Sequence, residues 1–72
     1  MENFINEFLG LLDEKPQFKV DGDTKFKEIP GWDSLVALSL IVMVSDNYGK
    51  SIDGEVVRSC TTIRDLFEII NA

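Results

Sequence analysis

The fold is decided by residues 31–49, which read GWDSLVALSLIVMVSDNYG. Apolar side chains recur here at helical spacing, so we expect a helix from about Ser34 to Tyr48. Asp33 is a natural N-cap, because its carboxylate can accept hydrogen bonds from the unpaired N–H groups of the first helical turn. Gly49 is a natural end, because glycine readily adopts the backbone conformation that closes a helix. Both ends of this helix are therefore predicted from local signals.

Apolar side chains cover this helix on two sides. One stripe consists of Ala37, Leu40, Ile41, Val44 and Tyr48, and a second, turned well away from it, of Leu35, Leu38 and Val42. In a small bundle one stripe faces the core, so we expect the second to be partly exposed. We interpret it as a docking face for partners, with Leu38 and Val42 as apolar anchors and acidic residues as its rim. The alternative is that this helix is simply the most buried one of the bundle.

The residues before this helix predict another helix and a long loop. We expect a helix over residues 2–13, ended by Pro16, with an apolar face made of Phe4, Ile5, Phe8, Leu9, Leu11 and Leu12. Residues 15–33 contain several turn-forming residues and predict an irregular segment, and loops of this length tend to be functional. We expect the loop to be pinned to the core by Phe18, Val20, Phe26 and Ile29.

The residues after the central helix predict two more helices. A short one is expected near residues 53–58. The last one begins at Thr61 or Thr62, where Thr62 and Asp65 have the spacing of a capping box. We therefore predict an all-α protein, a small four-helix bundle with three longer helices and one short one. Its long loop lies between the first and second helices, and residues 1–72 form a single domain.

The composition excludes several classes of function. The chain has 72 residues and a net charge of −6, from thirteen acidic and seven basic side chains. A domain this short buries only about 60% of the surface its unfolded chain exposes, which leaves little room for a deep catalytic cleft. The negative charge argues against nucleic acid and anionic membranes as partners, and it favours proteins with basic docking surfaces.

The residue types that are missing exclude further chemistry. There is no histidine and one cysteine, so a Ser-His triad, an intramolecular disulfide and a zinc site of the usual kind are excluded. We expect Cys60 to be a small buried filler of the core. The N-terminus does not look like a signal peptide and no apolar run reaches membrane-spanning length, so we expect a cytoplasmic protein.

Ser34 stands at the first position of the predicted helix, with an exposed hydroxyl. A phosphodiester attached there would meet free backbone N–H groups and the positive end of the helix dipole. No histidine is available to activate the hydroxyl as a nucleophile. Ser34 is therefore better suited to receive a group than to catalyse a reaction.

At this point the sequence resembles the acyl carrier protein family over nearly the whole chain. The resemblance is carried by Asp33-Ser34-Leu35 at the head of the helix, by the helix pattern through Tyr48-Gly49, by Ile52-Asp53, and by Thr62-Ile63-Arg64-Asp65-Leu66. It implies that a separate transferase esterifies Ser34 with 4′-phosphopantetheine from coenzyme A. The terminal thiol of that arm then holds acyl groups as thioesters.

The same resemblance implies roles for the neighbouring residues. Asp33 would help the phosphopantetheinyl transferase to recognise Ser34. Leu35, Leu38 and Val42 would lie on the side of the helix that faces partner enzymes. The implied partners are that transferase and the enzymes that load and process the acyl group, and we expect the carrier to be a monomer.

The chain departs from typical fatty-acid carriers along this helix. Ser39 and Ser45 stand where the family often has glutamates, and Val36 replaces a frequently acidic residue, while Asp46 remains. We therefore expect weaker electrostatic docking and a specialised carrier, for example in polyketide, lipid or surface-glycan synthesis. Trp32 is also uncommon at its position. It either covers the end of the bundle or contacts the arm or a partner.

The sequence thus predicts a non-catalytic acyl carrier of fatty-acid or specialised biosynthesis. A close alternative is a peptidyl or aminoacyl carrier, which an adenylating enzyme loads through the same arm. An unmodified helical adaptor that only binds partners is a third reading, although the motif serine is present. No acid–base or nucleophile constellation supports an enzyme.

Overall fold

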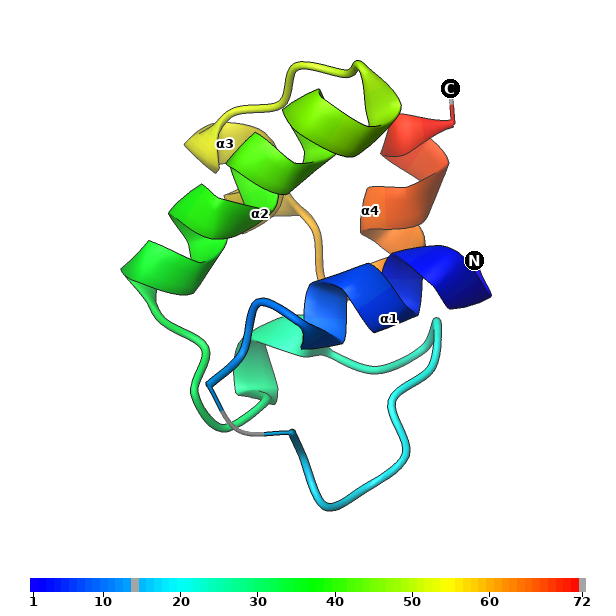
Figure 1. Cartoon of the computed structure of the whole chain (residues 1–72), viewed down its shortest axis with the longest axis vertical. Helices are drawn as coiled ribbons and strands as arrows, with labels where there is room; N and C mark the ends of the chain where they lie inside the picture. Colours follow the sequence, from blue (N-terminus) through cyan, green and yellow to red (C-terminus); the bar gives the residue numbers. More distant parts are fainter. Residues whose placement is uncertain (14, 72) are drawn as a thin grey trace.

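Four α-helices make up the computed structural model, which describes residues 1–13 and 15–71 (Figure 1). In chain order they are α1 (Glu2–Leu9), α2 (Ser34–Tyr48), α3 (Gly54–Ser59) and α4 (Ile63–Ile70), and a 3₁₀-helix, η1 (Phe26–Glu28), lies in the loop before α2. The predicted all-α fold with one short helix and a long loop between the first two helices is confirmed. No helix in the described part of the chain is long and apolar enough to cross a membrane.

Both ends of α2 are where the sequence predicts them. The Asp33 carboxylate accepts a hydrogen bond from the backbone N–H of Val36 at 2.9 Å. Gly49 ends the helix in the left-handed conformation, with φ of 65°, and its N–H donates to the Ser45 carbonyl at 3.2 Å. Because Asp33 uses a carboxylate as cap, α2 begins at Ser34 and not further along the motif.

The last two helices also begin at side-chain caps. Asp53 accepts from the backbone N–H of Val56 at 2.9 Å and begins α3. Thr62 and Asp65 form the predicted capping box of α4, in which each side chain accepts from the other residue's backbone N–H. The N–H groups of Thr62 and Thr61 donate to the Asp65 carboxylate and thereby lower its pKa.

The first helix is shorter than the sequence predicts. It ends at Leu9 instead of continuing to Asp13, because the hydrogen bonds tighten to the i→i+3 pattern. The N–H of Leu11 donates to the Phe8 carbonyl, and that of Leu12 to the Leu9 carbonyl, at 3.0 and 3.2 Å. Glycine at position 10 is a weak helix former, and the tighter turn buries Leu12 in the core.

Aromatic and aliphatic side chains from every helix and from the loop form one core. Its fully buried members are Phe4, Phe8, Phe26, Leu40, Val44, Ile63 and Leu66. Cys60 is 3% exposed, which confirms it as a core filler, and burial raises the pKa of its thiol. A buried thiol with a raised pKa is a poor nucleophile.

Hydrogen bonds tie the long loop to the start of α4. The N–H groups of Ile63 and Arg64 donate to the carbonyls of Thr24 and Gly22, at 3.1 and 2.8 Å. The Arg64 side chain also pairs with Asp23. The loop is therefore held against α4 by its backbone as well as by side chains.

The side chains that anchor the loop differ in part from the prediction. Phe26 and Ile29 are buried, as predicted, and Val20 is half-buried. Phe18 is 50% exposed, so its prediction as an anchor is wrong. The backbone contacts to α4 and the burial of Phe26 already fix the loop, and Phe18 lies outside that core.

A polar contact joins α1 to the end of α2. The Tyr48 hydroxyl donates to the Glu7 carboxylate, and the Asn47 amide donates to the same carboxylate at 2.6 Å. Burial, together with Glu7, raises the pKa of Tyr48 to about 12. No local signal in the sequence predicts this contact, because its partners are about forty residues apart.

Candidate functional site

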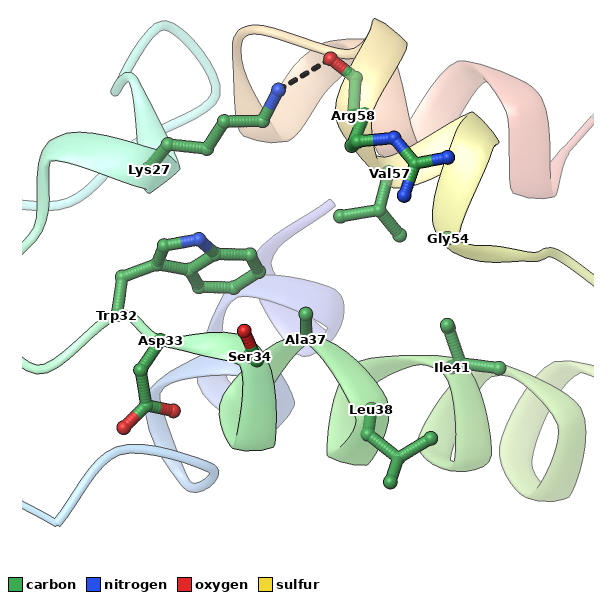
Figure 2. Close-up of a pocket in the computed structure, with 10 residues that line it drawn as sticks. All are labelled: Lys27, Trp32, Asp33, Ser34, Ala37, Leu38, Ile41, Gly54, Val57 and Arg58. Carbon is green, nitrogen blue, oxygen red and sulfur yellow. Dashed lines mark hydrogen bonds between the residues drawn. The ribbon is translucent and has the colours of Figure 1, made fainter.

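Ser34 is the first residue of α2, and its side chain is exposed, as the sequence predicts. Figure 2 shows its hydroxyl on the side of α2 that also carries Ala37 and Ile41, turned toward Trp32 and away from the Asp33 carboxylate. The long loop ends directly before Ser34, and the Asp33 cap determines that the helix begins there. Ser34 is therefore held at a fixed place with an accessible oxygen.

The surroundings of this oxygen suit an attached phosphodiester. The first N–H groups of a helix lack intrahelical partners, and the aligned peptide dipoles make this end positive. The Asp33 carboxylate, which would repel a phosphate, is engaged with the Val36 N–H and points away from the Ser34 hydroxyl (Figure 2). The residues present thus fit a phosphate ester on Ser34 Oγ.

A cavity of about 770 Å³ opens directly beside Ser34, between α2 and α3 (Figure 2). This α2–α3 cavity is lined by Lys27, Trp32, Asp33, Ser34, Ala37, Leu38, Ile41, Gly54, Val57 and Arg58. Its volume lies in the range of sites for small organic ligands, and it is widely open to solvent. Its lining combines apolar side chains with two cations, so it can accept an apolar group that ends in a polar one.

The α3 side of this cavity is not predicted from the sequence. Lys27 comes from η1 and Arg58 from α3, and the Lys27 ammonium donates a hydrogen bond to the Arg58 carbonyl. Val57 is buried and forms part of the wall. These residues are brought together by tertiary packing over about thirty positions, and no local pattern marks them.

Trp32 forms the wall of the cavity next to Ser34. Its ring stacks on Phe8 with centroids 6.0 Å apart, and it meets Phe26 edge-on at 5.0 Å. The prediction that Trp32 covers the end of the bundle is confirmed by these contacts. A contact of Trp32 with an arm or a partner stays a prediction, for which its place in the cavity wall is favourable.

The second apolar stripe of α2 is exposed, as predicted. Leu35, Leu38 and Val42 are 70%, 58% and 52% exposed. Leu38 and Val42 also border a shallower hollow of about 470 Å³, in whose lining Asp46 takes part. Exposed apolar side chains in a row beside an acidic one form a surface suited to a partner. Their role in docking is a prediction.

The buried side of α2 contains more residues than its helical spacing predicts. Leu40 and Val44 are fully buried, as expected, but Val36 and Met43 are buried too. The side chain of Val36 lies in the core, so this residue is not part of the exposed stripe. That it replaces a frequently acidic residue stays a prediction. Ser39 and Ser45 are the other two positions at which the sequence departs from typical fatty-acid carriers. Ser45 is exposed and Ser39 is half-buried.

Comparison with known proteins agrees with this geometry. Residues 3–70 match the family described as "Phosphopantetheine attachment site". "Acyl carrier protein 2, chloroplastic" of Spinacia oleracea is 35% identical over 54 residues, which are 75% of this chain and 41% of that protein. The matched region thus spans less than half of the relative's length. The chain belongs to the family of phosphopantetheine-attachment domains, which carry a covalent 4′-phosphopantetheine cofactor and are themselves non-catalytic.

Proposed function

We propose that Ser34 is the attachment point of 4′-phosphopantetheine and that the chain carries acyl groups on this arm. The observation that carries the proposal is the exposed Ser34 hydroxyl at the first residue of α2, beside a cavity of about 770 Å³. The arm would supply a terminal thiol that holds acyl groups as thioesters. The protein supplies position, recognition and shelter.

Each group at the site has a role in this proposal. Asp33 fixes the start of α2 and offers the transferase a carboxylate next to the serine. The N-terminus of α2 stabilises the negative charge of the phosphodiester. The apolar residues Ala37, Ile41 and Val57 line the cavity, where an acyl group would be removed from water.

The partners that we propose are a phosphopantetheinyl transferase and the enzymes that load and process the acyl group. Leu35, Leu38 and Val42 form the apolar part of the docking surface, and Asp46 and Trp32 lie at its edges. The net charge of −6 would steer the carrier toward basic surfaces and allow rapid release. Successive enzymes must bind and release the carrier, which favours a small, transient interface.

The pathway is proposed only as fatty-acid or specialised biosynthesis, with residues 1–72 acting as one carrier domain. An aminoacyl or peptidyl carrier would use the same serine and arm. A cytoplasmic location also stays a proposal, because the spinach relative is named as a chloroplast protein.

The proposal is tested by modification in vitro. The protein is incubated with coenzyme A, magnesium and a broad-specificity phosphopantetheinyl transferase, and its intact mass is measured. We expect a gain of one phosphopantetheinyl group. If the folded protein is not modified while a known carrier is modified in parallel, the carrier function is contradicted and an unmodified adaptor takes its place.

A further inference from the structure

Two cations stand at the rim of the α2–α3 cavity, across from Ser34 (Figure 2). They are Lys27, from η1, and Arg58, from α3, and the Lys27 ammonium donates to the Arg58 backbone carbonyl. This contact holds the lysine at the rim next to the arginine. The Lys27 nitrogen also lies 5.7 Å from the centroid of the Phe26 ring, a core side chain.

The charge at this rim is opposite to that of the protein as a whole. The chain carries a net charge of −6, yet the charged residues that line the cavity are Lys27, Arg58 and Asp33. The Asp33 carboxylate caps α2 and points away from the two cations (Figure 2). The cavity therefore presents a locally positive rim above apolar side chains.

The Arg58 guanidinium is available to a ligand. Among residues 1–13 and 15–71, the structure records no hydrogen bond or ion pair for this group. A guanidinium presents a planar set of donors that matches a carboxylate in a bidentate manner. Beside it, the lysine adds a second positive charge at short range.

We propose, on the basis of the carrier function above, that this cavity favours cargo with a free carboxylate at the end of a short apolar chain. Such cargo is the half-thioester of a dicarboxylic acid. Its methylene groups would pack on Ala37, Ile41 and Val57, and its carboxylate would pair with Arg58 and Lys27. A neutral acyl group gains nothing from the two cations, and the ammonium of an aminoacyl group is repelled by them.

The phosphodiester of the arm is a second source of negative charge near the site. It would sit on Ser34 Oγ at the N-terminus of α2, whereas the cations lie across the cavity, Lys27 beyond the Trp32 ring and the Arg58 guanidinium beside Val57 (Figure 2). The distal end of the arm is better placed to reach them. A cargo that lacks the carboxylate but is attached through the same arm keeps the phosphodiester. Comparing the two cargoes therefore separates the effect of the carboxylate from that of the phosphodiester.

The test compares glutaryl and pentanoyl groups, which have the same number of carbons and differ in the terminal carboxylate. Both are loaded by a broad-specificity transferase from the corresponding coenzyme A thioesters, and intact mass verifies the loading. The glutaryl group carries ¹³C at its free carboxyl, whose pKa is read by NMR titration. The thermal midpoint of unfolding is recorded for both forms at low and high salt.

In the native carrier we expect the glutaryl pKa to lie about half a unit below that of glutaryl-coenzyme A, because nearby cations favour the carboxylate. The glutaryl form should also unfold at a higher temperature than the pentanoyl form at low salt. The pKa shift and the difference in unfolding temperature should both be lost in the double variant Lys27→Gln/Arg58→Gln and be reduced in Arg58→Gln. Both should persist in the control Lys19→Gln. Lys19 is an exposed loop lysine outside the cavity lining.

The outcomes separate this inference from the function on which it rests. If no group can be loaded, the carrier function fails, and the inference fails with it. If loading succeeds but the glutaryl pKa is unshifted, the inference alone is overturned. The same holds if pentanoyl stabilises the protein as much as glutaryl does, or if Lys19→Gln has the effect of the rim variants.

Discussion

The indole of Trp32 stacks on the ring of Phe8, with centroids 6.0 Å apart and planes 11° apart. Phe8 is fully buried in α1, and Trp32 stands two residues before Ser34. The stack therefore fixes the last part of the loop against the core at the point where α2 begins. It also places one wall of the α2–α3 cavity beside the serine.

Trp32→Ala should lower the free energy of unfolding by about 2 kcal/mol, since it removes a half-buried ring from two aromatic contacts. Urea unfolding followed by circular dichroism measures this loss. Tryptophan fluorescence cannot be used for the comparison, because the chain has one tryptophan and the variant has none. Phe18→Ala is the control, an exposed aromatic in the same loop that should cost no more than about 0.5 kcal/mol. Equal losses in the two variants would contradict the stacking role of Trp32.

Asp33→Ala and Asp53→Ala should each lower the free energy of unfolding by about 1 kcal/mol, because each removes a side-chain cap with a 2.9 Å hydrogen bond. Their effects on modification should differ. Asp33→Ala should reduce the transferase kcat/KM at least tenfold, whereas Asp53→Ala should leave it nearly unchanged. If both variants are modified at the same rate, Asp33 acts only as a helix cap.

Leu38→Glu should leave the fold intact and weaken docking, because Leu38 is 58% exposed on the apolar stripe of α2. We expect kcat/KM for a phosphopantetheinyl transferase to fall about tenfold, which corresponds to about 1.4 kcal/mol. Leu40→Glu, two residues along, places a charge in the core and should unfold the domain. Unfolding of the Leu38 variant would instead show that Leu38 belongs to the core.

Tyr48 should titrate well above the ordinary range of tyrosine. Burial and Glu7 raise its pKa to about 12, so folding favours the protonated phenol. Its contribution to stability is complete below pH 10, the pKa in the unfolded chain, and is lost as the pH rises toward about 12. The chain has one tyrosine, so tyrosinate absorbance reports this group alone.

Two variants check the causes of that shift. Glu7→Gln should lower the Tyr48 pKa part of the way, since burial remains when the carboxylate is gone. Tyr48→Phe should show a smaller decrease in stability between pH 10 and 11 than the wild type does. A tyrosinate midpoint near 10 in the folded protein would contradict the buried contact with Glu7.

Helix ends were predictable because their signals are local. Asp33, Gly49 and Thr62 act within a few residues, so their roles follow from the sequence alone. The end of α1 was not predictable in the same way. The apolar pattern continues to Leu12, and the packing of Leu12 in the core, together with the weak helix propensity of Gly10, explains why the turn tightens after Leu9.

The direction of side chains on α2 was predictable only in part. The exposed stripe follows from helical spacing, but α2 is apolar on most sides, and periodicity does not show that Val36 and Met43 are buried as well. The exposure of Phe18 and the rim formed by Lys27 and Arg58 depend on contacts between distant segments. Ser34, in contrast, was found from its motif and its place at the head of a helix.

Intact mass after treatment with coenzyme A, magnesium and a phosphopantetheinyl transferase shows whether Ser34 carries the arm. Three proteins are compared: the wild type, Ser34→Ala, and Ser45→Ala, which removes an exposed serine from the other end of the same helix. We predict that the wild type and Ser45→Ala each gain one phosphopantetheinyl group, and that folded Ser34→Ala gains none. Modification of Ser34→Ala would contradict the assignment of the site.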